Sequence, residues 1–364
     1  MERFTKLKSM IFPREVIVGH NTTDEIKGMC QRITPGTNAL IVVDRNTKKI
    51  SGIRIMNLLA SSGYNVEMTV LSQPFIKKDI PTFWPTLREV EHVIRDARRH
   101  NADILLGVGG GSIIDVTKLA ASELTRVFIS VPTCASHDGI ASPRASLKDR
   151  RGSVSKTASS PLAVLADTAI ISKAPYRMLA SGCADVISNL SAVKDWQLAH
   201  RLKNEEFSNF AVSLSTTASR VVLDKSEDIR SGREEAVWQA VKSMIVSGVA
   251  MSVAGNTRPA SGAEHMFSHM LDRICPGKAM HGEQCGVGAI MMMYLHGGDW
   301  KEIRNALTSL GAPTTARELR IPNKKIIEAL IHAQEIRPDR YTILGEQGLT
   351  YEAAKKLAKI TGVI

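Results

Sequence analysis

A carboxylate and three histidines in the second half of the chain could form a catalytic metal centre. Asp185 is followed by His265 and His269, which are four residues apart, and then by His281. One aspartate with two histidines and an open position is typical of catalytic zinc, which polarises a carbonyl or stabilises an alkoxide. On a helix, His265 and His269 would face one cavity, so their spacing alone favours them as the ligand pair. The same residues also fit two surface histidines, and Asp185 alone fits a helix N-cap.

A glycine-rich turn in the first half could hold a diphosphate. The turn Gly107-Val108-Gly109-Gly110-Gly111-Ser112 follows an apolar run and precedes a helix-like stretch. Glycines let a ligand approach the backbone, and a helix N-terminus presents free N–H groups with a favourable dipole. A tight strand-to-helix turn without a ligand has the same pattern. The turn lacks the ending of a Walker A loop, and Lys118 is expected to face solvent or the far side of the cofactor.

Two further groups of polar residues follow predicted strands. Asp44 ends one strand, where it could accept hydrogen bonds from ribose hydroxyls or cap the next helix. After a later strand, Thr133, Ser136 and Ser142 could hydrogen-bond a nucleotide, and Asp138 could hold a substrate hydroxyl. Such loops bind ligands in open α/β sheets, although a serine- and threonine-rich turn without a function looks similar. A catalytic triad of the consecutive Ser-His-Asp residues is not expected, because neighbours in one loop seldom reach the required geometry.

Alternating strand and helix patterns must position these residues in the first half. Short apolar runs predict strands at Glu15–Gly19, Ala39–Asp44, Val66–Leu71, Ile104–Val108, Val127–Val131 and Val164–Ala166. Amphipathic stretches predict intervening helices at Asp24–Ile33, Leu87–His100 and Ile113–Leu124. This alternation predicts a mostly parallel sheet covered by helices. The polar segment Lys148–Thr157 predicts a surface hairpin or loop.

The second half has no strand signal after about Pro175 and is predicted to be helical. Its helix-compatible stretches are Ala184–Arg201, Glu205–Leu223, Glu234–Ala254 and Gly286–His296. A length of 364 residues suggests two domains. We therefore predict an α/β, Rossmann-like, dinucleotide-binding domain over residues 1–172, followed by an all-α domain over residues 173–364 that binds metal and substrate.

Composition narrows the class of protein and of ligand. The chain has a globular composition with a net charge of +11, which would attract nucleic acid, acidic lipid or a phosphorylated metabolite. The basic runs carry no zinc-finger or RNP-type signature, so we expect no nucleic-acid partner. Five dispersed cysteines without a Cys-x-x-Cys pair indicate neither a disulfide framework nor a thiolate zinc site and favour a reducing cytoplasm. The N-terminus has no apolar h-region, and no stretch approaches 18 uninterrupted apolar residues, so we expect neither secretion nor a membrane span.

Together these segments resemble the superfamily of glycerol dehydrogenase, iron-dependent alcohol dehydrogenase and dehydroquinate synthase, and most closely its archaeal sn-glycerol-1-phosphate dehydrogenases. The resemblance runs over nearly the whole chain and implies a dehydroquinate synthase-like fold. Its most specific part is the sequence Ser-His-Asp-Gly-Ile-Ala-Ser-Pro at Ser136–Pro143. The other carriers are Gly109–Asp115, Val131–Ala135, Cys183–Asp185, Glu264–His269 and His281–Glu283.

The resemblance implies a role for each site residue. It makes Asp185, His265 and His281 the metal ligands and replaces the histidine pair favoured by spacing. His269 then contacts the substrate beside the metal, as Asp138 and Asp185 do, and Asp138 and His269 are the catalytic residues. Iron-dependent relatives carry a histidine where this chain has Asn189, which favours one zinc ion per subunit with an open site. The implied cofactor-binding residues are Asp44, Gly109, Gly110, Gly111, Ser112, Ile113, Ile114, Asp115, Thr133, Cys134, Ala135, Ser136 and Ser142.

The resemblance implies reversible, NAD(P)H-dependent reduction of dihydroxyacetone phosphate to sn-glycerol 1-phosphate, the backbone of archaeal membrane lipids. We also expect a cytoplasmic homo-oligomer. A polyol dehydrogenase that uses unphosphorylated substrates and a dehydroquinate synthase-like lyase are the alternatives among enzymes. A basic nucleotide-binding interaction protein is the non-enzymatic alternative. The substrate phosphate requires cationic or N–H partners, for which the candidates near site segments are Arg144, Lys148, Lys156, Lys194 and Arg258.

Overall fold

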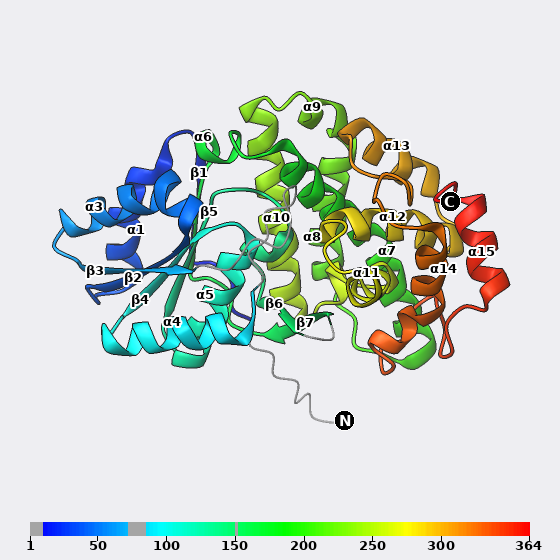
Figure 1. Cartoon of the computed structure of the whole chain (residues 1–364), viewed down its shortest axis with the longest axis horizontal. Coiled ribbons are helices and arrows are strands. Elements are labelled where there is room, and N and C mark those ends of the chain that lie inside the picture. Colours follow the sequence, from blue (N-terminus) through cyan, green and yellow to red (C-terminus); the bar gives the residue numbers. More distant parts are fainter. Residues whose placement is uncertain (1–9, 72–84, 150–151) are drawn as a thin grey trace, which may run out of the picture.

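A parallel sheet forms the first half of the protein (Figure 1). The computed structural model describes residues 10–71, 85–149 and 152–364, so the N-terminal residues considered for a targeting segment lie outside it. All six predicted strands are present, and they are ordered β1-β8-β5-β4-β2-β3 across the sheet. Their bounds are β1 Glu15–Gly19, β2 Asn38–Asp44, β3 Asn65–Leu71, β4 Ile104–Gly109, β5 Val127–Pro132 and β8 Ala163–Asp167.

Helices cover both faces of this sheet because its central strands are apolar on both sides. In β2, Ile41 and Val43 pack with α1 (Ile26–Ile33) and α3 (Ile53–Ala60). The alternate residues Leu40 and Val42 belong to the core that includes α4 (Leu87–Arg99) and α5 (Gly111–Leu124). Short helical segments complete this half: η1 Thr22–Glu25, α2 Arg45–Thr47, η2 Lys48–Gly52, η3 Asp138–Ile140 and α6 Thr168–Ile171.

The second half is helical, as predicted. Its first helix, α7, begins at Tyr176 directly after Pro175, earlier than the predicted start at Ala184. Asp185 therefore lies inside a 28-residue helix, and its interpretation as an N-cap is wrong. The other helices are α8 Asn209–Asp224, α9 Ser226–Arg230, α10 Glu234–Ala254, η4 Arg258–Ala260, α11 Ala263–Ile274, α12 His281–Leu295, α13 Trp300–Leu310, α14 Asn323–His332, η5 Ala333–Ile336 and α15 Tyr351–Ile360.

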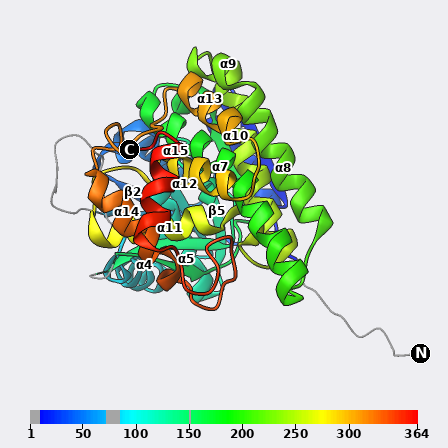
Figure 2. The ribbon, with the colours of Figure 1, turned by 90° about the vertical axis from the view of Figure 1, so that its right-hand side faces the viewer.

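Helix α10 is the one described helix whose length and composition would allow it to cross a membrane. Its most apolar window has a mean hydropathy of 1.3, and 67% of that window is buried inside the protein. Figure 2 shows α10 beside α8 along one flank of the molecule. The apolar composition of α10 is thus that of a core helix, which packs against its neighbours.

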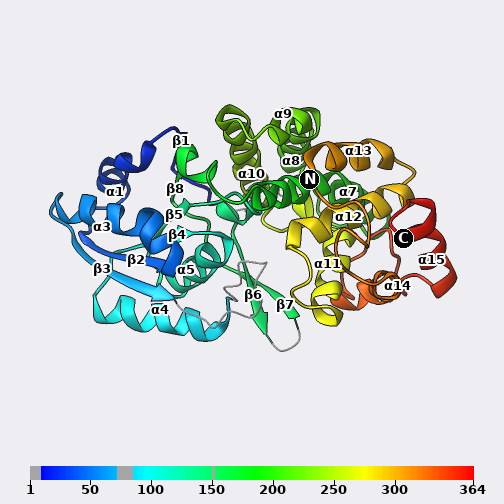
Figure 3. The ribbon, with the colours of Figure 1, turned by 45° about the horizontal axis from the view of Figure 1, so that its top comes forward.

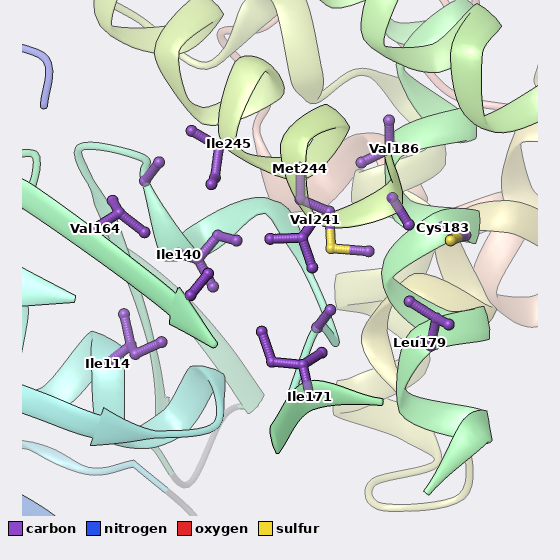
Figure 4. Close-up of a cluster of buried hydrophobic side chains, with 14 of the residues drawn as sticks. Ile114, Ile140, Val164, Ile171, Leu179, Cys183, Val186, Val241, Met244 and Ile245 are labelled. Carbon is purple, nitrogen blue, oxygen red and sulfur yellow. The ribbon is translucent and has the colours of Figure 1, made fainter. Parts of the chain in front are cut away.

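One hydrophobic core connects the sheet to the helical half. Figure 4 shows Ile114, Ile140 and Val164 facing side chains of α7 and α10, with Val241 and Met244 between the two halves. All of these residues are buried in the same cluster. This shared core fixes the carboxyl ends of the strands relative to the helices that carry the histidines.

A hairpin outside the sheet also connects the two halves. Strands β6 (Arg144–Asp149) and β7 (Gly152–Thr157) pair in antiparallel fashion, so the predicted hairpin is confirmed and begins earlier than expected. Figure 3 shows it between α5 and α11, both of which it contacts. Lys148 on β6 forms an ion pair with Asp272 on α11. The hairpin is therefore attached to the helix that carries His265 and His269.

Candidate active site

A cavity of about 1170 Å³ lies between the sheet and the helical half. Parallel strands place their carboxyl ends at one edge, and β5, β4 and β2 are neighbours in this sheet. The cavity wall accordingly includes Asp44 at the end of β2, Gly110 and Gly111 after β4, and Thr133 after β5. Helices α7, α11 and α12 contribute Asp185, His265, His269 and His281 to the same wall.

Asp185, His265 and His281 form a cluster that fits a metal ion, with Asp185 and His265 buried and His281 partly exposed. The Nε2 atoms of His265 and His281 each lie 3.6 Å from Oδ1 of Asp185. This oxygen is buried without a hydrogen-bond partner among the described residues, which is costly for a carboxylate unless a cation is bound. The geometry groups His265 with His281, whereas His269 lies outside the set of converging ligand atoms.

Hydrogen bonds outside the cluster orient both histidines. Nδ1 of His265 lies 2.9 Å from Oε1 of the buried Glu264, which also accepts a bond from Ser191. Nδ1 of His281 lies 3.1 Å from Oγ of Ser268. Because the Ser268 hydroxyl donates to Gln284, it accepts from His281. With an ion bound, Nδ1 would carry the proton in both histidines and Nε2 would face the ion beside Asp185, as metal ligation requires.

Asp138 lies beside this cluster and is held by a polar chain. Its backbone N–H donates to Oδ2 of Asp185 over 3.2 Å. Ser247 donates to Oδ2 of Asp138 over 2.7 Å, and Asn189 donates to Ser247 over 2.8 Å. Burial, and then the charge of Asp185, raise the pKa of Asp138 to about 6. Asn189 thus positions Asp138 through Ser247, a residue that no sequence pattern indicated.

His269 presents a neutral imidazole to the cavity. Burial, and then the charge of His265, lower the pKa of His269 to about 3. Its Nδ1 is buried and has no hydrogen-bond partner among the described residues. A neutral imidazole can donate from one ring nitrogen and accept at the other, so His269 is able to contact a bound polar group.

Three cations line the cavity near His269. Arg144 and Lys148 extend from the hairpin, and Arg337 comes from the C-terminal part of the chain. The charges of Arg337 and Lys148 contribute to the lowered pKa of His269. Burial, and then the charge of Arg337, lower the pKa of Arg144, so these two guanidinium groups act on one another. Converging cations are typical of an anion site. Of the three, Lys148 also forms an ion pair with Asp272, which lines the same wall.

The other sequence candidates for phosphate binding lie elsewhere. Lys156 and Lys194 are not part of the cavity wall. Arg258 is buried and forms a bidentate pair with Glu205, so its charge is already neutralised. Arg337 was missed because it lies far from every motif in the sequence. Among the described residues, its side chain forms one hydrogen bond, from Nη1 to Oγ1 of Thr257 over 3.5 Å, which leaves most of its donors available.

The glycine turn lies tightly against the loop that follows β5. A Cβ atom on Gly111 would lie 1.6 Å from Nε2 of His137, and one on Gly110 would lie 3.1 Å from Sγ of Cys134. Only glycine fits at Gly111 without displacing that ring. Of the expected cofactor residues, those in the cavity wall are Asp44, Gly110, Gly111, Ser112, Ile113, Asp115, Thr133, Cys134, Ser136 and Ser142. Gly109, Ile114 and Ala135 lie behind the wall.

Two acidic residues at this end of the cavity accept hydrogen bonds from neighbouring parts of the protein. Oδ1 of Asp44 accepts from Asn46 N and Thr47 N, so Asp44 caps the following helix, which was one of the two roles considered for it. The carboxylate of Asp115 accepts from Lys118 over 3.0 Å and from Ser146 N over 2.9 Å. The bond from Ser146 N joins α5 to the hairpin.

The expectation that Lys118 faces solvent or the cofactor is wrong. Its side chain is completely buried, because the hairpin and the loop after β5 cover this face of α5. Nζ donates to Asp115 and, over 2.6 Å in each case, to the carbonyl oxygens of Gly139 and Arg144. Lys118 therefore holds α5, the loop after β5 and the hairpin together.

Cys134 is expected to resist alkylation although it lies in the cavity wall. Burial raises the pKa of its thiol to about 11, so the thiol is protonated near neutral pH and only reacts as that pKa is approached. Treatment of the folded protein with iodoacetamide near neutral pH, followed by peptide mass mapping, should modify the partly exposed Cys275 first. Rapid modification of Cys134 would show that its thiol is activated and would contradict this expectation.

Comparison with known proteins shows similarity over the whole chain. Residues 17–175 match the model of the family described as iron-containing alcohol dehydrogenase. Glycerol-1-phosphate dehydrogenase [NAD(P)+] of Methanosarcina acetivorans is 52% identical over 357 residues, which are 98% of this chain and 97% of the relative. The protein of that name from Thermococcus sibiricus is 50% identical over 355 residues, or 98% of each chain.

Solved structures of lower identity share the fold. Glycerol dehydrogenase from Schizosaccharomyces pombe superposes with a TM-score of 0.79 at 20% identity and covers 99% of this chain and 92% of its own. A probable glycerol dehydrogenase from Sinorhizobium meliloti gives a TM-score of 0.76 at 19% identity and covers 98% of both chains. The predicted order of an α/β half and a helical half is thus that of a known fold.

Proposed function

The chain belongs to the glycerol-1-phosphate dehydrogenase family, and from this premise we propose that it reversibly reduces dihydroxyacetone phosphate to sn-glycerol 1-phosphate with NAD(P)H. The observation that carries the proposal is the position of the cluster of Asp185, His265 and His281. It opens onto the same cavity as the glycine turn and the cations near His269. One cavity therefore offers places for a dinucleotide, a metal ion and an anionic substrate. The product would supply the backbone of archaeal phospholipids.

The metal site fits zinc. Asp185, His265 and His281 would hold the ion, and a set of two nitrogens and one oxygen is common at catalytic zinc. When bound, the ion supplies a Lewis acid for the substrate carbonyl, which lowers the cost of negative charge on oxygen during hydride transfer. Asn189, which stands where iron-dependent relatives have a histidine, is bonded to Ser247 and leaves the number of nitrogen ligands at two. We propose one zinc ion per subunit.

The chain's own side chains would bind and orient the substrate. Asp138 would accept a hydrogen bond from a substrate hydroxyl, since Ser247 fixes one of its carboxylate oxygens and leaves the other. His269, as a neutral imidazole, would contact the substrate and pass a proton to or from the reacting oxygen. Arg144, Lys148 and Arg337 would bind the phosphate. The residues expected to bind the cofactor would hold its diphosphate at the glycine turn and its nicotinamide near Thr133–Ser136.

The two halves of the chain would bind different ligands. We propose that residues 1–172 bind the dinucleotide and residues 173–364 bind metal and substrate. All five cysteines are free thiols, which supports a reducing cytoplasm. We propose that the protein forms a homo-oligomer. Its ligand would be a phosphorylated small molecule and not a nucleic acid. A polyol dehydrogenase would have no use for the three cations near His269, and a lyase of the dehydroquinate synthase type would consume no NADH.

Substitution of Arg337 by alanine should weaken binding of the phosphorylated ketone specifically. Loss of charged hydrogen bonds to phosphate costs about 1.5–3 kcal/mol, so KM for dihydroxyacetone phosphate is expected to rise about 10- to 100-fold. The kcat/KM for dihydroxyacetone, which has no phosphate, should stay unchanged. Initial rates with both ketones test this, with the exposed Lys324→Ala as a control for net charge. An equal loss with both ketones would argue against a phosphate site at Arg337.

A further inference from the structure

Thr257 lies in the cavity wall and is bonded to two guanidinium groups. It directly precedes η4, in the turn between α10 and α11, and its side chain is buried. Its Oγ1 accepts a hydrogen bond from Nη2 of Arg340 over 2.8 Å and a longer one from Nη1 of Arg337 over 3.5 Å. Thr257 and Arg337 line the cavity, whereas Arg340 lies outside the wall that the described residues form. The hydroxyl therefore links a cation of the wall to a second cation behind it.

The two guanidinium groups leave the hydroxyl proton of Thr257 without an acceptor. A hydroxyl group has one donor and two acceptor sites, whereas a guanidinium group can only donate. The oxygen must therefore accept from both arginines, and its O–H bond must point elsewhere. The described residues offer this proton no hydrogen-bond acceptor. Because a buried donor without an acceptor is costly, a bound ligand that accepts from it would complete the group.

The charge around this hydroxyl favours an anion as that ligand. Burial, and then the charges of Arg337 and Arg258, lower the pKa of Arg340 to about 9, so the group stays a cation near neutral pH. The carboxylates of Glu205 and Glu264 act in the opposite direction, but neither forms an ion pair with Arg340. A partly buried cation without an ion pair leaves a positive potential at the neighbouring cavity wall.

Arg340 fixes the positions of its neighbours in the wall. Its Nη1 donates to the carbonyl oxygen of Ser261 over 2.7 Å, and Ser261 also lines the cavity. One planar guanidinium thus bridges the two ends of the segment from Thr257 to Ser261. The backbone N–H of Arg340 donates to the carbonyl oxygen of Arg337 over 3.0 Å, which closes a turn. Arg340 therefore holds the Thr257 hydroxyl and the backbone of Arg337 in one arrangement.

We propose that Thr257 donates a hydrogen bond to the phosphate group of the substrate and that Arg340 is the residue that positions it. The inference rests on the proposed function, which places the phosphate at Arg337. A phosphate oxygen bonded to Arg337 lies within reach of the Thr257 hydroxyl, because Nη1 and Oγ1 are 3.5 Å apart. A phosphate group offers several strong acceptor oxygens, so it can take both donors. An unphosphorylated ketone makes no such contact, and Thr257 therefore contributes to the choice of substrate.

Substitution of Thr257 by valine tests the hydroxyl, because valine keeps the shape of the side chain and lacks the donor. A hydrogen bond to a charged group is at stake, so KM for dihydroxyacetone phosphate should rise at least about 10-fold. The kcat/KM for dihydroxyacetone should stay unchanged. Thr257→Ser, which keeps the hydroxyl, should restore the wild-type KM. Thr308→Val is the matched control, since Thr308 is exposed on α13. An equal loss with both ketones in Thr257→Val, or no loss with either, would overturn the inference.

Two further variants separate the hydroxyl from its neighbours. If Thr257 binds phosphate itself, Thr257→Val combined with Arg337→Ala should raise KM for dihydroxyacetone phosphate above that of Arg337→Ala alone. Equal KM values would mean that Thr257 acts only through Arg337, which contradicts the inference. Arg340→Lys keeps the charge but lacks the planar fork, so it should raise the same KM and leave dihydroxyacetone unaffected. A wild-type KM in Arg340→Lys would remove the positioning role of Arg340.

Binding of inorganic phosphate gives a readout that needs no turnover. Thermal unfolding of the full-length, zinc-loaded protein is followed at increasing phosphate concentration, and Tm without phosphate verifies that each variant is folded. An anion that binds the folded state raises Tm. Thr257→Val should need about 10-fold more phosphate than the wild type or Thr257→Ser for the same rise. No rise in the wild type, or a full rise in Thr257→Val, would overturn the inference. The expected rises without reduction of either ketone would refute the proposed function alone.

Discussion

Replacement of His265 by alanine should abolish bound metal and turnover together. The imidazole supplies one of the proposed ligand atoms, 3.6 Å from Asp185 Oδ1, and is oriented by the buried Glu264. Without it the site loses a ligand, and the buried Glu264 carboxylate loses the donor that His265 provides. The kcat is expected to fall by at least about 10³-fold, equivalent to roughly 4 kcal/mol of transition-state stabilisation from a Lewis acid.

The experiment pairs metal content with steady-state rates. Zinc per subunit is measured by elemental analysis after gel filtration, and NADH oxidation is measured on the same sample. His332→Ala is the control, because His332 is an exposed histidine whose partner is Glu335. It should keep both metal and activity. A His265→Ala protein without metal that turns over at the wild-type rate would eliminate the metal from the reaction.

Replacement of Lys118 by alanine should have the largest effect on stability. The change leaves the buried Asp115 carboxylate without its cation and removes the donor to two backbone carbonyls. Breaking a buried ion pair on one side costs about 3–5 kcal/mol, so the free energy of unfolding should fall by about that amount. Urea unfolding, analysed by linear extrapolation, measures the change.

The same substitution should also weaken cofactor binding. Lys118 fixes α5, whose first turn carries the glycines, relative to Gly139 and to the hairpin at Arg144. When that connection is lost, the turn is less well preorganised for the diphosphate, and KM for NADH should rise. Lys324→Ala, which removes an exposed charge, should change the free energy of unfolding by less than about 0.5 kcal/mol. A loss below about 1 kcal/mol in Lys118→Ala would mean that its three bonds contribute little net stability.

The fold could be predicted because its signals are local. Alternation of short apolar runs with amphipathic stretches gave all six strands of the sheet, and the absence of strand patterns after Pro175 gave the helical half. The first and last residues of the elements were predicted less accurately. The start of α7 was placed at Ala184 because small and polar residues from Tyr176 onward carry little periodic signal, although Pro175 marks the true start.

The parts of the site that were missed depend on contacts between distant segments. Lys118 is a charged residue on a helix, and nothing near it in the sequence shows that Gly139 and Arg144 cover it. Arg337 belongs to no motif, and it reaches the cavity only through the packing of the C-terminal helices. Spacing favoured the pair of His265 and His269, because an i, i+4 pair is visible in sequence, whereas the approach of α12 to α11 is not.

The most direct test of the account follows NADH and NADPH absorbance with dihydroxyacetone phosphate, and with dihydroxyacetone for comparison, before and after removal of zinc. The product enantiomer is identified in the same reactions. We predict cofactor oxidation with the phosphorylated ketone that stops when zinc is removed, returns when zinc is restored, and yields sn-glycerol 1-phosphate. A preference for dihydroxyacetone, or a rate that does not change when the metal is removed, would contradict the account.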